Sequence, residues 1–422
     1  MKRRQFLHAA GASAFLAGCA SISTHARPHV IVIGGGYGGA TAARYLRLWS
    51  DNSIDVTLIE QNAQFISCPL SNLVLGGSRQ IADLTMSIDT LASNHGVRIV
   101  RDLVTSINAE KHTVTLATGQ TLNYDRLIVS PGVGFLWEQL PGMRKPGAQD
   151  TILHAWKAGP QTTALRAQLE AMPDGGVYAM TIPPAPYRCP PGPYERASQI
   201  AFYFSRHKPK SKVLILDAND DVVSKGPLFK KVWKERYGGI IDYRPSFRTA
   251  DVDAAARTAI SELGDKVRAD VLNVIPPQRA GSIAVQSGLA NVNARWCGVD
   301  FLTFESTQVK NIHVLGDAIA VAPLMPKSAH MANQHAKVCA AAVVDLLSGR
   351  APYAHPMLTN TCYSFVSDHD VIHVASVHAY NAEKKTLLVV SGSGGVSAGP
   401  SALEGEYALN WARNIWADTL GG

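Results

Sequence analysis

Short apolar runs followed by helical stretches recur along the chain. Residues 29–33 (HVIVI) are apolar and mostly β-branched, a pattern that predicts a buried strand. The stretch ATAARYLRLW at 40–49 predicts a helix, and residues 55–59 (DVTLI) predict a second strand ending just before Glu60. Apolar runs that alternate with helices in this way indicate an α/β fold with parallel strands.

The turn between the first strand and the first helix is rich in glycine. Gly34, Gly36 and Gly39 fit the pattern GxGxxG, and Glu60 follows at the end of the second strand. Glycines permit a tight turn and a close approach of a pyrophosphate to the helix N-terminus, and the acid accepts a hydrogen bond from a ribose hydroxyl. The four residues together predict a dinucleotide-binding site.

Two later segments indicate which dinucleotide is bound. YDRLIVSPG ends in Gly132, and NIHVLGD predicts a strand that ends in Gly316 and Asp317. With the glycine turn, these segments resemble the flavoproteins that have two dinucleotide-binding domains. The resemblance implies FAD, with Asp317 near the ribityl-pyrophosphate part of the flavin. Val104 is predicted as a further cofactor contact.

A second strand–helix–strand unit follows in the middle of the chain. Residues 177–182 (VYAMTI) and 212–217 (KVLILD) predict its strands, and YERASQIAFYFSRH predicts its helix. The glycine fingerprint expected between the first strand and the helix is replaced by PPAPYRCPPGPYER. Proline cannot present the N–H groups that bind pyrophosphate. We therefore predict a Rossmann-like domain that has lost its NAD(P)H site.

Cys189 lies within this stiff proline-rich turn and is predicted to face the flavin. Pro193 suits the first position of the following helix. The helix dipole, Arg188 and Arg196 would each favour a thiolate, which predicts a lowered pKa for Cys189. The alternative is a buried structural cysteine, but the position in place of the nucleotide fingerprint favours a chemical role.

The net charge argues against a nucleic-acid-binding protein, and the N-terminus indicates an exported one. The chain has 422 residues, 46% of them hydrophobic, and a formal net charge of +7, to which the first 26 residues contribute three positive and no negative charges. That balance is too mild to indicate nucleic-acid binding. Arg3 and Arg4 followed by a small-residue apolar stretch are typical of a twin-arginine export signal, which predicts a periplasmic protein folded around its cofactor before export.

Two processing routes remain open at this signal. Cleavage after Ala26 would release the protein, whereas LAGC resembles a lipobox in which Cys19 would be acylated and would tether the protein to a membrane. No other stretch approaches the ~20 apolar residues that span a bilayer, so we predict no transmembrane segment.

The other cysteines differ in context. The chain has no CxxC, so we predict no zinc site and no other metal site, and it has no CxxCH to attach a c-type haem. Cys339 lies in an Ala/Val-rich helix and is interpreted as a core residue, and core packing is also favoured for Cys297. Cys68, in QFISCPLSNLVLGG, is either an inert loop cysteine or a thiol beside the flavin that anchors it covalently.

The predicted domain organisation follows from these segments. The C-terminal part contains LTNTCYSFVSDHDVIHVASV, a glycine-rich loop and the helical YALNWARNIWADTL, and has too little apolar material to stand alone. We predict a signal peptide at 1–26, a split FAD domain at 27–150 and 290–355, a degenerate NAD-type Rossmann domain at 151–289, and a C-terminal flavin-side domain at 356–422 that packs on the others.

Several long segments resemble the flavoprotein subunit of flavocytochrome c sulfide dehydrogenase. They include IVIGGGYGGATAARYL, SCPLSNLVLGG, PPAPYRCPPGPYERASQ, FESTQVKNIHVLGDA, MPKSA and LTNTCYSF, and the likeness runs from about residue 28 to the C-terminus. The resemblance implies FAD bound through a thioether to Cys68. It also implies that Cys189 and Cys362 form a redox-active disulfide on the face of the flavin.

The same resemblance implies a sulfide dehydrogenase. Hydrosulfide would attack the disulfide, two electrons would pass to FAD, and a c-type haem on a partner subunit would accept them singly. Arg188 is a candidate to attract hydrosulfide, and Lys327 a candidate cofactor contact that stabilises reduced flavin; solvated surface charge is the alternative for each. The competing functions are a sulfide:quinone oxidoreductase, an NADH-dependent disulfide reductase and a non-catalytic FAD electron-relay subunit.

Overall fold

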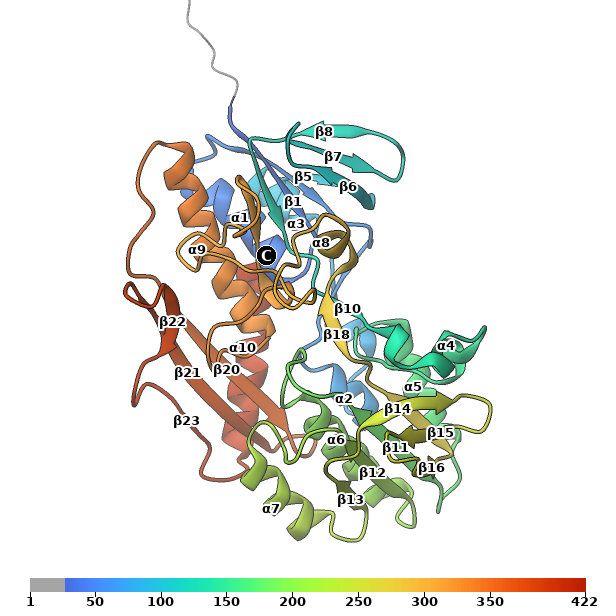
Figure 1. The fold of residues 1–422 in the computed structure, drawn as a ribbon. Helices are drawn as coiled ribbons and strands as arrows, with labels where there is room; N and C mark the ends of the chain where they lie inside the picture. Colours follow the sequence, from blue (N-terminus) through green and yellow to red (C-terminus); the bar gives the residue numbers. More distant parts are fainter. Residues whose placement is uncertain (1–26) are drawn as a thin grey trace, which may run out of the picture.

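The structure is a computed structural model that describes residues 27–422. The predicted export signal and Cys19 lie outside the described residues. The ribbon in Figure 1 shows a sheet and its helices in the upper part, a second sheet in the lower part, and the C-terminal strands and helix along one side of both.

A five-stranded parallel sheet with the order β19-β9-β1-β2-β5 forms the first region. Helices α1 (Tyr37–Trp49) and α9 (Ala329–Leu347) pack against each other beside it. β-branched residues dominate the central strand and are fully buried, because a parallel sheet is covered on both faces. The strands are β1 (His29–Ile33), β2 (Asp55–Ile59), β5 (Arg98–Val100), β9 (Arg126–Val129) and β19 (Ile312–Val314).

This sheet joins strands from both sequence segments of the predicted FAD domain. β19 comes from the last third of the chain, yet it pairs in parallel with β9. The two predicted strands at 29–33 and 55–59 have the observed bounds. Helix α1 begins three residues earlier than predicted, because Gly36 serves as its N-cap and the helix runs through Gly38 and Gly39.

The middle region is a four-stranded parallel sheet with the order β13-β12-β11-β17. Strands β11 (Val177–Ile182) and β12 (Lys212–Asp217) have the predicted bounds. Helix α6 (Gly192–His207) starts two residues earlier than predicted, so Pro193 is its second residue rather than its first. The remaining elements are β13 (Ile241–Arg244), β17 (Val271–Val274), α5 (Pro160–Ala171), α7 (Gly226–Arg236), and the meander β14 (Thr249–Asp253), β15 (Thr258–Ser261) and β16 (Lys266–Arg268).

Short elements connect the two sheets. Strands β10 (Val133–Phe135) and β18 (Gln278–Ala280) pair antiparallel between the upper and lower parts in Figure 1. Helix α2 (Ser71–Gly76) packs against α5 and α6 of the middle region. The other short elements are β3 (Phe65–Ile66), β4 (Thr85–Met86), α3 (Thr90–His95), β6 (Val104–Asn108), β7 (Thr113–Leu116), β8 (Thr121–Asn123), α4 (Ala148–Thr151), α8 (Ser282–Gln286), and single 3-10 turns at 81–84, 137–139, 141–144 and 316–318.

The C-terminal region is an antiparallel sheet covered by one long helix. The sheet holds β20 (Met357–Phe365), β21 (Val371–Asn381), β22 (Thr386–Val389) and β23 (Gly395–Val396). Helix α10 (Ala402–Leu420) packs on β21 and on α1, and Trp416 Nε1 donates to Tyr37 Oη at 2.9 Å. The C-terminal segment thus packs on the first helix of the five-stranded sheet region.

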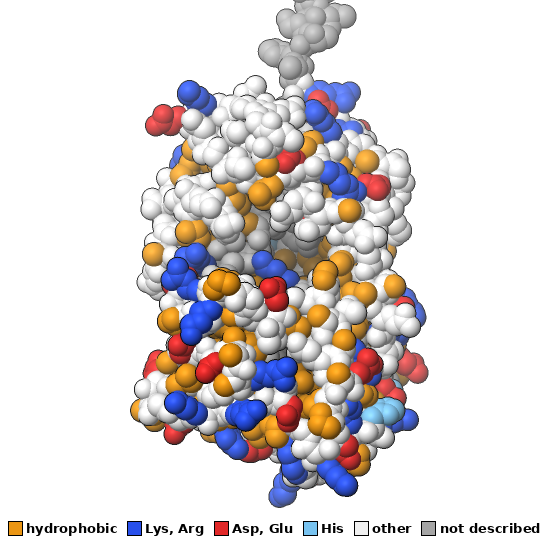
Figure 2. Space-filling model, turned by 90° about the vertical axis from the view of Figure 1, so that its right-hand side faces the viewer, with side chains coloured by type: hydrophobic (Ala, Val, Ile, Leu, Met, Phe, Trp, Pro, Cys, Tyr) orange, Lys and Arg blue, Asp and Glu red, His pale blue; other side chains and the backbone are white. Residues whose placement is uncertain are grey.

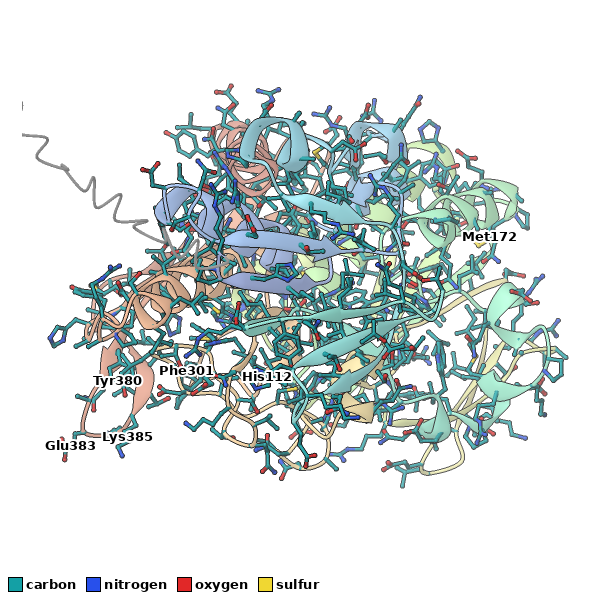
Figure 3. All side chains as sticks on the ribbon, turned by 90° about the horizontal axis from the view of Figure 1, so that it is seen from above. His112, Met172, Phe301, Tyr380, Glu383 and Lys385 are labelled. Atoms are coloured by element: carbon teal, nitrogen blue, oxygen red, sulfur yellow. The ribbon has the colours of Figure 1, made fainter. Side chains whose placement is uncertain are left out.

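Met172 of the middle region and the β21–β22 hairpin of the C-terminal region lie on opposite sides of the molecule (Figure 3). Figure 3, seen from above, shows Met172 of the middle region on one side and Tyr380, Glu383 and Lys385 of the β21–β22 hairpin on the other. Figure 2 shows a hollow about midway down one face, with basic side chains beside it.

Candidate active site

A cavity of about 840 Å³ lies where the three regions meet. This volume is in the range of cofactor and substrate sites. Of the predicted site residues, only Gly39 and Lys327 are outside the cavity lining. Those that line it are Gly34, Gly36, Glu60, Cys68, Val104, Gly132, Cys189, Gly316, Asp317 and Cys362.

The glycine turn forms one end of the cavity. Gly34 has φ +98°, and a Cβ there would lie 2.3 Å from the carbonyl oxygen of Ser130. Gly39 does not line the cavity, but a Cβ there would lie 1.8 Å from Gly34 O, so it allows the helix to pack on the turn. The N-cap of α1 is Gly36, so no side chain caps the helix, and the first residues of α1 border the cavity. The arrangement fits a pyrophosphate at a helix N-terminus.

Two acidic residues mark the strand ends beside this turn. Glu60 Oε2 accepts from Gly35 N at 2.6 Å, and its Oε1 accepts from Asn62 N at 2.7 Å, so the carboxylate is fixed at the edge of the cavity. Asp317 is different, because its Oδ1 is buried and has no hydrogen-bond partner in residues 27–422. Burial raises the pKa of Asp317, and the charges of Arg188 and Lys327 oppose that rise.

These observations test whether a flavin dinucleotide fits. A buried carboxylate oxygen without a donor is costly, and a ribityl or ribose hydroxyl would supply the missing donor. Trp156 Nε1 also lines the cavity and is buried without an acceptor in the described part of the chain. With the glycine turn at one end, the residues present fit FAD.

Cys68 lines the cavity close to two cationic side chains. Burial lowers the pKa of Lys157, with a further lowering from the charge of Arg188, whereas the charge of Cys68 raises it. Burial lowers the pKa of Arg188, but the charges of Cys68 and Asp317 raise it above its usual value. Covalent attachment of the flavin at Cys68 stays a prediction.

Cys189 lies in a constrained turn at the start of α6. Its φ is +58°, in the left-handed region, and its N–H donates to Lys327 O at 2.8 Å. Gly192 N donates to Cys189 O at 2.8 Å, and a Cβ on Gly192 would come within 2.8 Å of the Cys189 sulfur. Only glycine at position 192 leaves room for the Cys189 sulfur in this turn. The Cys189 side chain lines the cavity.

The predicted lowering of the Cys189 pKa is wrong. Burial raises the pKa of this thiol, and the nearby Cys362 and Glu195 raise it further, against Arg188 and Lys225. The guanidinium of Arg196 donates to Asn72 Oδ1 and to backbone oxygens of His154 and Ala155. Desolvation therefore outweighs the helix dipole and the neighbouring cations.

Cys362 faces the same cavity from β20. Asn360 Nδ2 donates to its sulfur at 3.4 Å. Burial raises the pKa of Cys362, while Lys225 and the hydrogen bond from Asn360 oppose that rise. Cys189 and Cys362 are both free thiols in the structure. Their shared cavity suits the predicted disulfide, which stays a prediction.

Glu195 is a site residue that the sequence did not reveal. It lies in the first turn of α6, is buried, and lines the cavity. Its Oε1 accepts from Phe365 N at 2.9 Å and its Oε2 from Asn72 Nδ2 at 2.8 Å. Burial raises the pKa of this carboxyl. In sequence it resembles any acid that complements a helix N-terminus, so only the fold identifies it.

The two predicted cationic contacts have different positions. Arg188 lines the cavity, and its guanidinium donates to Trp156 O. Lys327 lies behind the cavity wall, where Nζ donates to Asp317 O at 2.9 Å and sits 3.6 Å from the ring centre of Trp296. Burial lowers the pKa of Lys327 to about 7, against the charge of Asp317. The N-terminal residues of α9 following Lys327 do line the cavity.

The second Rossmann unit is filled by its own side chains. Asp217 ends β12, the position at which a nucleotide ribose is usually bound. Its Oδ2 accepts instead from Tyr194 Oη at 2.7 Å and from Tyr243 Oη at 3.1 Å, and its Oδ1 accepts from Asn219. These contacts support the predicted loss of an NAD(P)H site.

Residues 27–422 contain no group of three His, Cys, Asp or Glu side chains arranged to hold a metal ion. Over the same residues, no helix combines the length and the apolar character that crossing a bilayer requires.

Three family models match the chain. Residues 28–170 match pyridine nucleotide-disulphide oxidoreductases. Residues 162–276 match the central domain of the flavocytochrome c sulfide dehydrogenase flavoprotein chain, and residues 354–420 match the flavin-binding domain of flavocytochrome c sulphide dehydrogenase.

Individual relatives agree with these models. The mitochondrial sulfide:quinone oxidoreductase of Dictyostelium discoideum is 25% identical over 299 residues, which cover 68% of this chain and 64% of that protein. The sulfide dehydrogenase [flavocytochrome c] flavoprotein chain of Chlorobaculum thiosulfatiphilum is 56% identical over 45 residues, covering 11% of this chain and 92% of that sequence. The alignment with the Dictyostelium protein thus spans slightly less than two thirds of its length.

The fold also matches a solved structure. The sulfide:quinone oxidoreductase of Aquifex aeolicus superimposes with a TM-score of 0.74 at 18% identity, over 94% of this chain and 92% of that one. The match confirms the predicted α/β fold with two Rossmann-like domains.

Proposed function

We propose that this chain is a sulfide-oxidising flavoprotein, which oxidises hydrosulfide to polysulfide or sulfur with FAD bound in the central cavity. The proposal rests on one observation: Cys189 and Cys362 line the same cavity as Gly34, Glu60 and Asp317, which fit FAD. FAD bound there would accept an electron pair from the sulfur centre and release it one electron at a time.

The sulfur chemistry is assigned to Cys189 and Cys362, joined as a disulfide in the resting enzyme. Hydrosulfide attacks one sulfur, the S–S bond breaks, and the electron pair of that bond leaves with the other sulfur as a thiolate. The attacked cysteine becomes a persulfide. A second hydrosulfide takes the outer sulfur and leaves as hydrogen disulfide, so that both cysteines are reduced. FAD held at the glycine turn would supply the acceptor for the two electrons released when the disulfide re-forms. The proline-rich turn holds Cys189 in position for these steps.

Two other side chains support this chemistry. Arg188 lines the cavity and attracts an anionic substrate. Glu195 accepts the proton released when hydrogen sulfide or a thiol ionises, because it is a buried carboxylate with a raised pKa near both sulfurs.

We assign the electron acceptor to a c-type cytochrome subunit, since the two models that match residues 162–276 and 354–420 are those of flavocytochrome c flavoproteins. A quinone is the second candidate, because the relatives from Dictyostelium and Aquifex are sulfide:quinone oxidoreductases. The proposal includes export to the periplasm by the twin-arginine route, followed by either cleavage after Ala26 or lipidation at Cys19. It also includes a thioether between Cys68 and FAD.

The test is steady-state sulfide oxidation by the purified holoprotein, assayed with a c-type cytochrome and with a soluble quinone. We expect Cys189→Ser and Cys362→Ser each to lower turnover on the order of 10³-fold or more, as for loss of a nucleophile. Cys339→Ala, which alters a buried cysteine in α9, serves as the control and should retain turnover. Full activity in either serine variant would contradict the disulfide route. If the enzyme reduces the quinone but not the cytochrome, the quinone replaces the cytochrome as the proposed electron acceptor.

The anchor at Cys68 is tested separately. The wild-type protein is denatured in acid and run on a gel, and flavin fluorescence should stay with the protein band. Cys68→Ser should release the flavin under the same conditions. Fluorescence that leaves the wild-type band would exclude the thioether without affecting the sulfur chemistry.

A further inference from the structure

Lys225 is a buried lysine that reaches from the middle region to the strand carrying Cys362. It has φ +56° and is the N-cap of α7, and its side chain extends to the C-terminal sheet. Nζ donates to Cys362 O at 2.8 Å, to Ser364 Oγ at 2.7 Å and to Ile372 O at 3.3 Å. The residue is 7% exposed, so this contact is shielded from water.

The three acceptors are neutral, which leaves the ammonium without a compensating charge among them. Burial lowers the pKa of Lys225 to about 8, whereas the charges of Cys362, Glu195, Cys189 and Glu404 raise it. A buried cation held only by neutral groups is unfavourable, and a nearby anion relieves that cost. Cys362 is the first of these neighbours, and in the proposed chemistry attack on Cys189 would release the Cys362 sulfur as a thiolate.

We propose that Lys225 is a positioning residue whose ammonium stabilises negative charge on the sulfur of Cys362. The inference rests on the proposed function for its role in turnover, because opening of the Cys189–Cys362 disulfide is what creates that charge. It extends the function by naming a group outside the cavity lining that makes the disulfide easier to reduce.

The charged and titratable groups around Cys362 allow this assignment. Glu195, from α6, opposes ionisation of the sulfur. Asn360 and Ser328 favour ionisation by hydrogen bonding, and Lys225 is the cation that favours it most. For Cys189, burial, Cys362 and Glu195 raise the pKa, and Arg188 and then Lys225 lower it. Lys225 is therefore the first cation to act on Cys362, whereas Arg188 is the first to act on Cys189.

The test measures the two thiols in the reduced holoprotein, without sulfide. The protein is reduced anaerobically with excess dithiol and alkylated with iodoacetamide between pH 6 and 11, and labelling of each cysteine is followed by peptide mass spectrometry. Because only the thiolate reacts, the midpoint of the rate–pH profile reports the thiol pKa whatever the access to it. In the wild type we expect a lower midpoint for Cys362 than for Cys189; the reverse order would overturn the proposal.

Three variants separate charge from architecture. Lys225→Met should move the Cys362 midpoint upward by about one pH unit or more, since an opposite charge nearby lowers an acid pKa by ~1–3. Lys225→Arg should restore most of the shift. Lys208→Met is the control, because Lys208 is also buried and its amine donates to Glu170 O and Met172 O in the middle region.

Because both thiols are measured without sulfide, these results do not depend on whether the protein oxidises sulfide. An unchanged Cys362 midpoint in Lys225→Met, or the same rise in Lys225→Arg, would show that the lysine only ties two regions together. The reduction potential of the cysteine pair gives a second readout: a tenfold loss of thiolate stabilisation makes it ~30 mV more negative for a two-electron couple. These measurements retain their meaning even if the wild type proves inactive with sulfide.

Discussion

The two strand–helix–strand units of this protein share one frame and differ in the turn that follows the first strand. In β1–α1–β2 that turn is built from glycines, and the first residues of α1 border the cavity. In β11–α6–β12 it is built from prolines around Cys189, and the acid at the end of β12 is satisfied by two tyrosines. The turn, rather than the frame, therefore decides which groups such a unit presents to the cavity.

The largest effect should come from closing the glycine turn. Gly34→Ala adds a Cβ 2.3 Å from a backbone oxygen at a position with φ +98°, so the turn must distort. We expect loss of bound flavin, measured as the ratio of flavin absorbance to protein absorbance after purification. Gly119→Ala is the matched control, because Gly119 also has positive φ but a Cβ there meets nothing within 4 Å. Equal flavin content in both variants would contradict the assigned role of the turn.

The next largest effect on activity should come from removing the buried carboxyl group of Glu195, which lies near both sulfurs. Glu195→Gln should lower sulfide turnover by roughly 10²-fold, the usual range for loss of a proton acceptor. Glu195 has a raised pKa, so wild-type activity should rise with pH as the carboxyl deprotonates through that pKa. The glutamine variant should lose this acidic limb of the pH–rate profile. An unchanged profile with lower activity would mean that Glu195 only holds Asn72 and the backbone of Phe365 in place.

A change in the second turn should separate sulfur chemistry from flavin binding. Gly192→Ala places a Cβ 2.8 Å from the Cys189 sulfur and should displace that side chain. We expect turnover to fall by roughly 10–100-fold, since a small misplacement of a reacting group is costly, with full flavin content. Loss of flavin along with activity would contradict the separation of the two units. Flavin content and turnover are measured on the same preparation.

The smallest effect should come from the side chains that fill the former nucleotide site. Tyr243→Phe removes one hydrogen bond to Asp217 and should lower the free energy of unfolding by about 1 kcal/mol. Sulfide turnover should be unchanged, and NADH should still fail to reduce the flavin. Thermal unfolding and an NADH titration check these outcomes. Flavin reduction by NADH in this variant would show that the tyrosines, rather than the proline turn, exclude the nucleotide.

Much of the fold could be predicted from the sequence. The strands at 29–33, 55–59, 177–182 and 212–217 are short β-branched runs whose bounds coincide with the structure, because buried parallel strands tolerate few polar residues. The glycine turn and Cys189 were predicted for a related reason, since glycine and proline impose local geometry.

The remaining features depend on contacts between regions distant in sequence. The raised pKa of Cys189 follows from burial at the junction of the three regions, which no local pattern records. Glu195 lines the site because α6 meets β20, and Lys225 reaches the Cys362 carbonyl from the N-cap of α7. Lys327 was predicted beside the flavin from its position in MPKSA, but its side chain turns back onto Asp317 O and Trp296.

The central claim is that a sulfur centre has replaced a nicotinamide site as the source of electrons. The most direct measurement is anaerobic addition of sulfide, and separately of NADH, to the holoprotein while the visible absorption of the flavin is followed. We predict bleaching by sulfide and none by NADH, with sulfide bleaching lost in Cys189→Ser and in Cys362→Ser. Bleaching by NADH with sulfide inert would contradict the account and restore a nucleotide site to the proline-rich turn.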